Sequence, residues 1–223
     1  SEMPLDRKRK EKIANSCSVR PEHVISAPDI ESIYEVPLNF EKDNLGATVL
    51  ELLKLKGGRR AGDMGKWRAF VRRMRGVRRE VNIAIVGKYF DTGDFVLSDA
   101  YLSVIEAIKF SAYKLGVKPV IHWLNSKDFS AQGGPASGGE RGKRSLRELS
   151  KYAGIIVPGG FGETGIDGKL RVIRFAREHK IPYFGLCYGM QLALVEYARN
   201  VLRLKGAHTT EIEAAAKDPV IAV

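Results

Sequence analysis

The stretch that decides the fold is GIIVPGGFGETGIDGKLRVIRFAREHKIPYFGLCYGMQLALVEYARNV, residues 154–201. It contains two glycine-rich turns, and each turn follows a short apolar run and precedes a helical pattern. Parallel strands joined by helices bring their carboxyl ends to one edge of a sheet, where such folds bind ligands. The stretch therefore predicts a β-α-β unit with both turns at the same edge.

The second turn, Gly185-Leu186-Cys187-Tyr188-Gly189, has a cysteine where the G-x-S-x-G nucleophile elbow has its serine. A helix is expected from about Tyr188 to Val201, and the amides and dipole at its start would favour the thiolate. A cysteine at such a corner is equally compatible with a small buried hydrophobic residue. The spacing by itself leaves both interpretations open.

The first turn runs from Val157 to Gly162. Its glycines allow backbone N–H groups to approach a ligand with no Cβ in the way. Amides presented in this manner can hold a developing oxyanion or a phosphate group. The two turns together predict a nucleophile beside a set of amide donors.

Strands and helices alternate through the second half of the chain. Strands are expected over 81–86 and 117–124, and a helix over 98–115 is expected to place one apolar face inward, formed by Leu102, Ile105, Ile108 and Ala112. This alternation predicts an α/β fold, a doubly wound parallel sheet with helices on both faces.

The chain divides into three parts by composition. Residues 1–58 lack the apolar mass for an independent core, so they are expected to be the end of a larger domain, with Ser26 or Asp29 as a helix cap. Residues 59–80 are rich in arginine and are expected to be a basic interdomain linker. Residues 81–223 are expected to form the main α/β domain.

Composition narrows the class of protein. The 223 residues are 44% hydrophobic, which can fill a core, and no run approaches the roughly 18 apolar residues of a membrane span. The chain is expected to be soluble, cytoplasmic and without a membrane partner. Its two cysteines, Cys17 and Cys187, do not form a disulfide framework, so both are expected to be reduced, with Cys17 structural.

The formal net charge of +11 admits a nucleic-acid partner. Aromatic residues are not interleaved with the arginines as a single-strand stacking surface requires, and basic runs are more often solvated faces. No nucleic-acid binding is therefore expected, although a noncatalytic basic module remains an alternative.

Several long motifs carry a family resemblance: VPGGFG from Val157, GLCYGMQLALVEYARNV from Gly185, Thr209-Thr210-Glu211, GKY from Gly87, DAYLSVIEAIK from Asp99 and SAPDIESIYEVP from Ser26. In their order along the chain these motifs resemble the class I glutamine amidotransferases and, among these, the CTP synthase family. The resemblance implies an amidotransferase-like (flavodoxin-like) fold for residues 81–223. For residues 1–58 it implies the C-terminal end of a synthetase (amidoligase) domain, the tail of a second α/β domain.

The resemblance also implies roles for individual residues. Cys187 would be the nucleophile that forms a thioester with glutamine, and Glu211 would meet the α-amino group of glutamine. The family usually has leucine where this chain has Tyr188, a difference expected to narrow the substrate pocket or to change its edge. The remaining residues of the oxyanion and substrate site would be Gly160, Phe161, Tyr188, Gly189, Met190 and Gln191.

A complete CTP synthase makes CTP from UTP, ATP and glutamine-derived ammonia, uses Mg²⁺ and assembles as a homotetramer, so the resemblance implies these partners. Lys12 would contact the triphosphate of UTP or CTP, and Pro28, Asp29 and Ile30 would line the ATP site. Because no G-x-x-x-x-G-K-[ST] motif occurs in the chain, no cofactor and no metal ligand are expected within these residues.

A thiol nucleophile needs a base to collect and return a proton. The histidine and glutamate partners of the family are expected beyond residue 223, so the chain is expected to be an incomplete amidotransferase domain that hydrolyses glutamine very slowly. Of the four histidines, only His208 could approach Cys187, and it is not expected to be the base, since the resemblance makes it part of the HTTE loop. The rival interpretation is a cysteine hydrolase or stress protein on the same fold.

Overall fold

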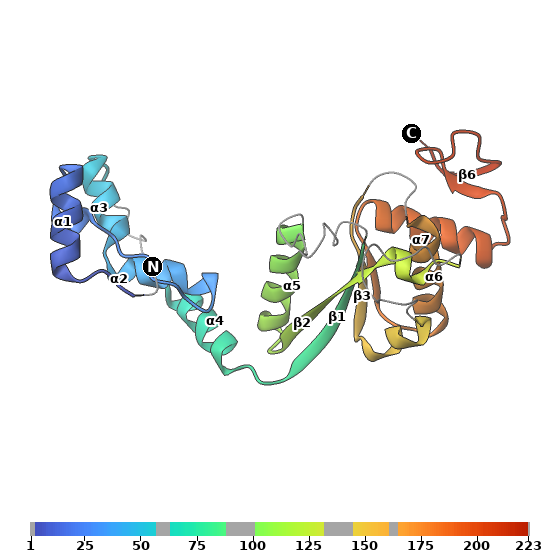
Figure 1. The fold of residues 1–223 in the computed structure, drawn as a ribbon, viewed down its shortest axis with the longest axis horizontal. Coiled ribbons are helices and arrows are strands. Elements are labelled where there is room, and N and C mark those ends of the chain that lie inside the picture. The colour runs from blue at the N-terminus through green and yellow to red at the C-terminus, as the bar shows by residue number, and fades with distance from the viewer. Residues whose placement is uncertain (1–2, 57–62, 88–100, 132–144, 161–164, 223) are drawn as a thin grey trace. The chain divides into compact units, whose positions relative to one another are not determined.

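The structure is a computed structural model that describes residues 3–56, 63–87, 101–131, 145–160 and 165–222. The chain forms two compact units, Ser1–Gly76 and Val77–Val223 (Figure 1). No helix in these described residues is long and apolar enough to cross a membrane.

The described residues of the first unit form helices and connecting segments. An N-cap opens the first helix, since the Asp6 carboxylate accepts a hydrogen bond of 2.7 Å from the amide of Arg9. The ring of Tyr34 meets Trp67 and Phe70 edge-on, with centroids 6.2 and 5.3 Å apart. The helices and 3-10 turns are α1 (Arg7–Cys17), η1 (Pro21–His23), η2 (Ile33–Glu35), α2 (Val36–Lys42), α3 (Leu45–Leu52) and α4 (Gly65–Gly76).

Two predictions from the sequence, the basic linker and the helix cap, concern residues of the first unit. Part of the expected linker, 65–76, is helix α4, which belongs to this unit because its aromatic side chains pack on Tyr34. The boundaries at 58 and 80 remain predictions. The expected cap at Ser26 or Asp29 is wrong: no helix starts there. The Ser26 hydroxyl instead accepts a hydrogen bond of 2.9 Å from the amide of Leu5, and the next helical turn follows Ser32.

The second unit is built on a parallel sheet of strands β1 (Glu80–Gly87), β2 (Lys118–Asn125), β3 (Gly154–Val157) and β4 (Tyr183–Gly185), in the order β2-β1-β3-β4. In the register, Ile83 of β1 lies opposite Ile121 of β2 and Gly154 of β3. The predicted doubly wound parallel sheet is therefore confirmed. Two short strands, β5 (Ala207–Thr209) and β6 (Asp218–Ile221), pair separately.

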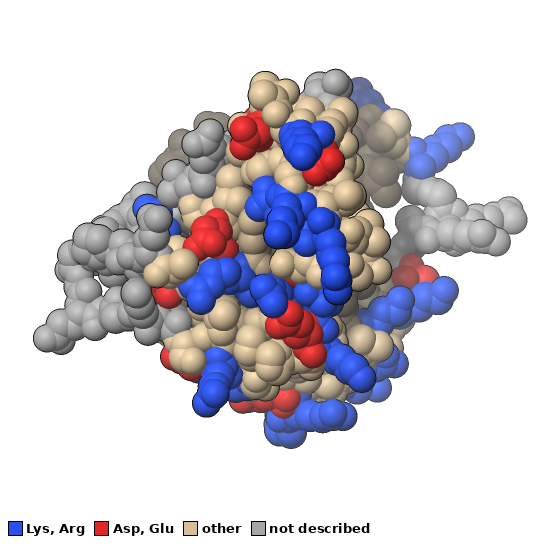
Figure 2. Space-filling view, turned by 90° about the vertical axis from the view of Figure 1, so that its right-hand side faces the viewer, with Lys and Arg blue, Asp and Glu red and all other residues tan. Residues whose placement is uncertain are grey.

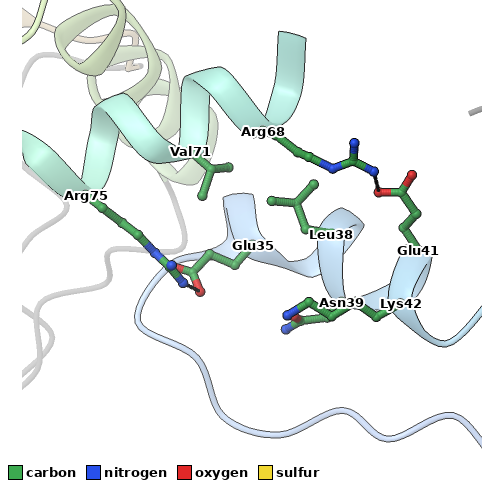
Figure 3. A pocket seen from close by; sticks show the side chains of 8 residues that line it. All are labelled: Glu35, Leu38, Asn39, Glu41, Lys42, Arg68, Val71 and Arg75. Carbon is green, nitrogen blue, oxygen red and sulfur yellow. Dashed lines mark hydrogen bonds and ion pairs between the residues drawn. The ribbon is translucent and has the colours of Figure 1, made fainter. Parts of the chain in front are cut away.

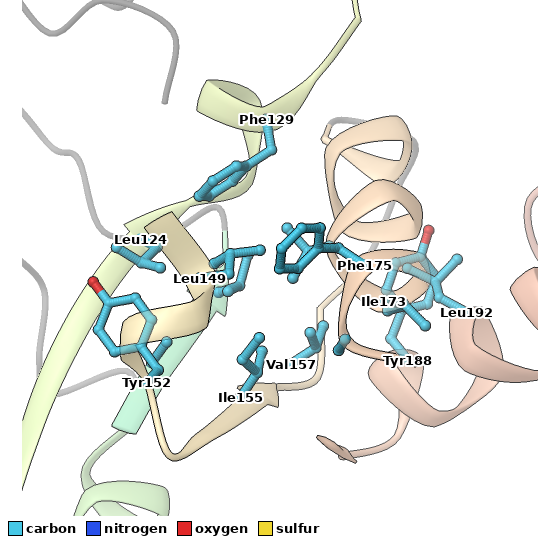
Figure 4. Close-up of a cluster of buried hydrophobic side chains, with 14 residues drawn as sticks. Leu124, Phe129, Leu149, Tyr152, Ile155, Val157, Ile173, Phe175, Tyr188 and Leu192 are labelled. Atoms are coloured by element: carbon cyan, nitrogen blue, oxygen red, sulfur yellow. The ribbon is translucent and has the colours of Figure 1, made fainter. Parts of the chain in front are cut away.

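Helices cover both faces of the four-stranded sheet. Ala84 and Val86 of β1 face the larger core, whereas Ile85 between them faces helix α5 (Leu102–Lys114), as the two-residue period of a strand requires. Figure 4 shows the larger core, to which η5 (Leu146–Lys151), α6 (Ile166–Glu178) and α7 (Tyr188–Asn200) contribute. The short turn η4 (Ser126–Phe129) leaves the carboxyl end of β2.

One predicted core position of α5 is wrong. Ile105 is buried and Ile108 packs on the smaller core, but the side chain of Leu102 is 56% exposed. Tyr101, one residue earlier, occupies the core instead and lies 6.2 Å from the ring of Trp123. Tyr101 precedes Ile105 by four residues, the spacing of one helix face, and so takes the inward position predicted for Leu102.

Candidate active site

Cys187 is the corner residue between β4 and α7. Its backbone has φ 50° and ψ −108°, and its side chain is exposed. A positive φ is strained for a residue that has a Cβ, and such residues persist where the surrounding structure holds them, often at functional sites. The interpretation of Cys187 as a buried hydrophobic residue is therefore wrong, and the interpretation as an elbow is supported by its geometry.

The glycines on either side of Cys187 make this corner possible. A Cβ on Gly185 would lie 2.5 Å from the carbonyl carbon of Gly189, and a Cβ on Gly189 would lie 2.0 Å from the carbonyl oxygen of Val157. That same carbonyl of Val157, the last residue of β3, accepts a hydrogen bond of 2.9 Å from the amide of Leu186. Helix α7 therefore starts in direct backbone contact with β3.

The two glycine-rich turns meet in space. A Cβ on Gly159 would lie 3.6 Å from the Cβ of Cys187, so the loop after β3 passes beside the nucleophile corner. Gly160 follows in this loop and is half-buried. Phe161, the other residue expected there, lies outside the described residues. The carboxyl-edge juxtaposition that the spacing predicted is therefore present for Gly159 and Cys187.

The first turn of α7 points its amides back toward the corner. Met190 and Gln191 donate backbone hydrogen bonds of 3.0 and 3.1 Å to the carbonyl of Cys187, and Gly189 donates one of 2.9 Å to Leu186. The start of a helix carries a partial positive charge, which favours an anion beside it. The positive end of α7 therefore lies at Cys187.

Tyr188, next to the cysteine, points away from solvent. Its ring is 1% exposed and belongs to the larger core (Figure 4), with the Nζ of Lys169 5.0 Å from the ring centroid. A cation over an aromatic face is attracted by the ring. The ring thus packs in the core between α6 and α7. The effect of this tyrosine on the substrate pocket remains a prediction.

Three other expected substrate residues lie around the start of α7 and beyond it. Met190 is 48% exposed, whereas the side-chain oxygen Oε1 of Gln191 is buried and has no hydrogen-bond partner among the described residues. Glu211 is exposed in the turn after β5, where its amide donates to the Oγ1 of Thr209 at 3.3 Å. Their roles toward glutamine remain predictions.

The histidines have partners of their own. His122 lies 2.8 Å from the Oδ1 of Asn82 on β1, and His179 stacks on Phe175 with centroids 3.8 Å apart. The Nδ1 of His208 accepts a hydrogen bond of 2.9 Å from the amide of Thr209 in β5. His23 belongs to the first unit, where it lies 2.8 Å from a guanidinium nitrogen of Arg20. The role of His208 as a base remains untested.

Several residues around α7 were not singled out from the sequence. Glu196 is 1% exposed, and Arg177 of α6 donates two hydrogen bonds of 2.9 and 2.8 Å to its carboxylate, which raises the pKa of Arg177. The hydroxyl of Tyr183 on β4 donates to the carbonyl of Gly189 at 2.7 Å. A usable signal for Glu196 and Lys169 was a charged residue on the apolar face of a helix.

The nucleotide-binding residues expected in the first unit are accessible but not gathered into a pocket. Lys12 is exposed on α1, and residues 28–30 lie in a segment without regular structure between η1 and η2. A groove of about 400 Å³ in this unit lies elsewhere, between α2 and α4 (Figure 3). It is lined by Glu35, Leu38, Asn39, Glu41, Lys42, Arg68, Val71 and Arg75.

Some of the basic side chains pair with acidic ones. In the groove of Figure 3, Arg68 pairs with Glu41 at 2.6 Å and Arg75 pairs with Glu35 at 2.6 Å. In Figure 2, which shows one face of the molecule, acidic side chains lie among the Lys and Arg side chains. On α6, for example, Arg174 pairs with Glu178 at 2.8 Å. This pattern is typical of a solvated surface.

Within the described residues, no group of three or more His, Cys, Asp or Glu side chains has the arrangement of a metal site.

Comparisons with known proteins follow the same two parts. The family described as glutamine amidotransferase class-I matches residues 96–220, and the family described as CTP synthase N-terminus matches residues 1–55. A CTP synthase from Sulfolobus acidocaldarius is 43% identical over 219 residues, and one from Pelotomaculum thermopropionicum is 44% identical over 221 residues. These alignments cover 98% and 99% of this chain but 38% of each relative.

A solved structure gives the same result. The glutaminase domain of the Trypanosoma brucei CTP synthase, with bound acivicin, matches with a TM-score of 0.53 and 33% identity, over 64% of this chain and 50% of that one. The fold, the elbow geometry and the matched residues agree. The chain belongs to the class I glutamine amidotransferase family, and over nearly its whole length it is similar to CTP synthases.

Proposed function

We propose that this chain carries the glutaminase nucleophile of a CTP synthase, with Cys187 as the attacking residue. The observation that carries the proposal is the exposed Cys187 at a left-handed corner, at the start of α7 and beside Gly159. A nucleophile must be accessible and must face donors that stabilise the developing charge. The exposure of Cys187 and its position beside the glycine-rich loop support the proposal.

In the proposed reaction, the Sγ of Cys187 forms a bond with the carboxamide carbon of glutamine, and the carbonyl electron pair moves onto oxygen. Amides near Gly160 and Tyr188 hold this oxyanion. When the oxyanion collapses, the carbon–nitrogen bond breaks and the nitrogen takes up the thiol proton, so ammonia leaves and a glutamyl thioester remains. Water then releases glutamate and restores the thiol.

Substrate contacts are proposed for the residues that match the family. Gly160 and Phe161 would line the oxyanion and substrate pocket, and Glu211 would bind the α-amino group of glutamine. The structure gives an independent reason to include Gln191 among these substrate-binding residues. Its buried Oε1 has no hydrogen-bond partner among the residues that the structure describes, so it can accept a hydrogen bond from a ligand. The segment Tyr188, Gly189, Met190 and Gln191 would lie along the bound glutamine.

The whole enzyme is a wider proposal, since the chain spans 38% of the length of its curated relatives. We propose that the ammonia is used to convert UTP into CTP with ATP and Mg²⁺, in a homotetramer in the cytoplasm. Within this chain, Lys12 would contact a nucleotide triphosphate, and Pro28, Asp29 and Ile30 would contact ATP. The printed sequence contains no P-loop motif, and no metal site was found among the residues that the structure describes.

Labelling with a diazoketone analogue of glutamine tests the nucleophile. Peptide mapping by mass spectrometry should find the label on Cys187, and millimolar glutamine should slow it. Cys17 is the matched control, because it is also exposed but lies at the end of α1. Labelling of Cys187 without any protection by glutamine would support instead a cysteine hydrolase with another substrate.

The rate at which ammonia is released from glutamine tests whether a residue of this chain acts as the base for Cys187. The 223-residue chain should release it very slowly, and His208→Ala should leave that rate unchanged. An ordinary enzymatic rate that is abolished by His208→Ala would overturn the expectation that the base is not His208.

A nucleic-acid role is tested separately by titrating salt. Arg68, Arg75, Arg174 and Arg177 are paired with carboxylates. Because aromatic residues are also not interleaved with the arginines, no binding to DNA or RNA is expected even at low salt.

A further inference from the structure

The hydroxyl of Tyr183 joins β4 to the first turn of α7. Tyr183 lies two residues before Gly185, and its side chain packs against the larger core. Its hydroxyl donates a hydrogen bond of 2.7 Å to the carbonyl oxygen of Gly189, two residues after Cys187. Burial raises the pKa of Tyr183, so the hydroxyl keeps its proton and stays a donor at neutral pH.

This hydrogen bond acts where the backbone is strained. Cys187 has φ 50°, and a residue in that conformation relaxes unless neighbouring contacts hold it. On one side of the corner, the amide of Leu186 is held by the carbonyl of Val157 at 2.9 Å. On the other side, the Tyr183 hydroxyl holds Gly189. Cys187 is thus held between two fixed points.

We propose that Tyr183 is a positioning residue for the nucleophile, and that its hydroxyl keeps the first turn of α7 aimed at the sulfur of Cys187. This inference rests on the proposed role of Cys187 as the nucleophile. Tyr183 does not touch the reacting atoms in this arrangement. It acts through Gly189, because movement of that carbonyl turns the helix start away from the thiolate.

The positive end of α7 supplies a readout that a purely structural role would not move. The same thiolate attacks the CH₂–I carbon of iodoacetate and of iodoacetamide and displaces iodide, so the ratio of the two rates does not depend on how much thiolate is present. A helix start raises the rate of the anionic reagent relative to the neutral one. Cys17, the last residue of α1, lies at the opposite end of a helix dipole and is an internal reference in the same molecule.

The experiment compares the 223-residue chain with its Tyr183→Phe and Tyr197→Phe variants. Tyr197 is the matched control, since it lies on α7 and is 47% exposed. Alkylation at each cysteine is quantified by peptide mass spectrometry with both reagents. Tyr183→Phe should lower the iodoacetate-to-iodoacetamide ratio of Cys187 by about two- to fivefold, the size of a helix-end effect. Tyr197→Phe, and the ratio of Cys17 in all proteins, should not change.

Replacing Tyr183 with 4-aminophenylalanine, which restores a donor at the same ring position, should recover the ratio. This rescue separates the lost hydrogen bond from general loosening of the core. An unchanged ratio at Cys187 in Tyr183→Phe overturns the inference, and so does a lowered ratio that the amino group fails to restore. Suppose that glutamine protects Cys187 from alkylation equally in the parent chain and in Tyr183→Phe, and that the iodoacetate-to-iodoacetamide ratio is the same in the two. The proposed function then stands, and the positioning role of Tyr183 is refuted.

Discussion

Gly189→Ala is the substitution that most directly tests how the nucleophile corner is built. Gly189 lies in the first turn of α7, against the end of β3. An added Cβ would lie 2.0 Å from the carbonyl oxygen of Val157 and 2.9 Å from its carbonyl carbon, whereas ordinary contacts begin at 3.4 Å. The first turn of α7 therefore has to move away from the sheet.

The energetic effect is large because the obstructing atoms belong to the backbone. The Val157 carbonyl is held by the amide of Leu186, and no side-chain rotation relieves the clash. Overpacking in a well-packed core usually costs about 1–3 kcal/mol, and a clash with a fixed strand is expected at or above the upper end of that range. A total stability of about 5–15 kcal/mol makes such a loss easy to measure.

Gly154→Ala is the matched control, because Gly154 lies on the neighbouring strand β3 but its nearest contacts to a new Cβ are 3.6 Å. It should be neutral or stabilising by up to about 1 kcal/mol, since alanine restricts the unfolded chain more than glycine. Urea unfolding is followed by the fluorescence of Trp123, with Trp67→Phe in every variant so that the second unit alone is reported.

The same proteins are treated with the diazoketone analogue of glutamine. Gly189→Ala should lose stability by about 3 kcal/mol or more relative to Gly154→Ala and should label more slowly at Cys187. If Gly189→Ala unfolds at the same urea concentration as Gly154→Ala and labels at the parent rate, the contact of α7 with β3 does not hold the corner, and the reasoning is refuted.

Three further outcomes are expected. Arg177→Met should destabilise the second unit by about 2–4 kcal/mol in urea unfolding, because it leaves the buried carboxylate of Glu196 without its cation; Arg174→Met, which breaks the exposed pair with Glu178, should change it by less than about 1 kcal/mol. The hydrogen bond from Arg75 lowers the pKa of Glu35 in the folded protein. As the pH falls, Glu35 is therefore protonated more readily in the unfolded chain, which favours unfolding of the first unit. The stabilising effect of this ion pair on the first unit should be complete above about pH 4.5 and be lost as the pH falls through the lower pKa of folded Glu35. In Glu35→Gln, unfolding followed by Trp67 fluorescence should depend less on pH over this range. Burial raises the pKa of Tyr183 in the folded protein. The contribution of its protonated hydroxyl to the stability of the second unit should therefore be complete below about pH 10 and be lost as the pH rises further. Unfolding followed by circular dichroism should show a smaller loss of stability at alkaline pH in Tyr183→Phe.

Local patterns in the sequence were sufficient to predict strands β1 and β2 and helices α5 and α7 of the second unit. Strand β1, helix α7 and the corner at Cys187 depend on residues a few positions apart, since apolar period, glycine and helix start act over one or two turns of chain. The motifs around Gly159 and Gly185 were also enough to indicate the family. Ser26 and Asp29 show the limit of such patterns, because a capping residue cannot be told from a loop residue that bonds elsewhere.

The arrangement around the nucleophile depended on contacts between distant parts of the chain. The sequence by itself determined that a cysteine stands at a strand-to-helix corner between glycines. Only the tertiary structure decided that Gly189 rests on the carbonyl of Val157, that Tyr183 holds Gly189, and that the ring of Tyr188 enters the core. The physical reason is that these contacts arise when helices pack on the sheet, and the packing depends on the volume and direction of side chains from β3, α6 and α7 together.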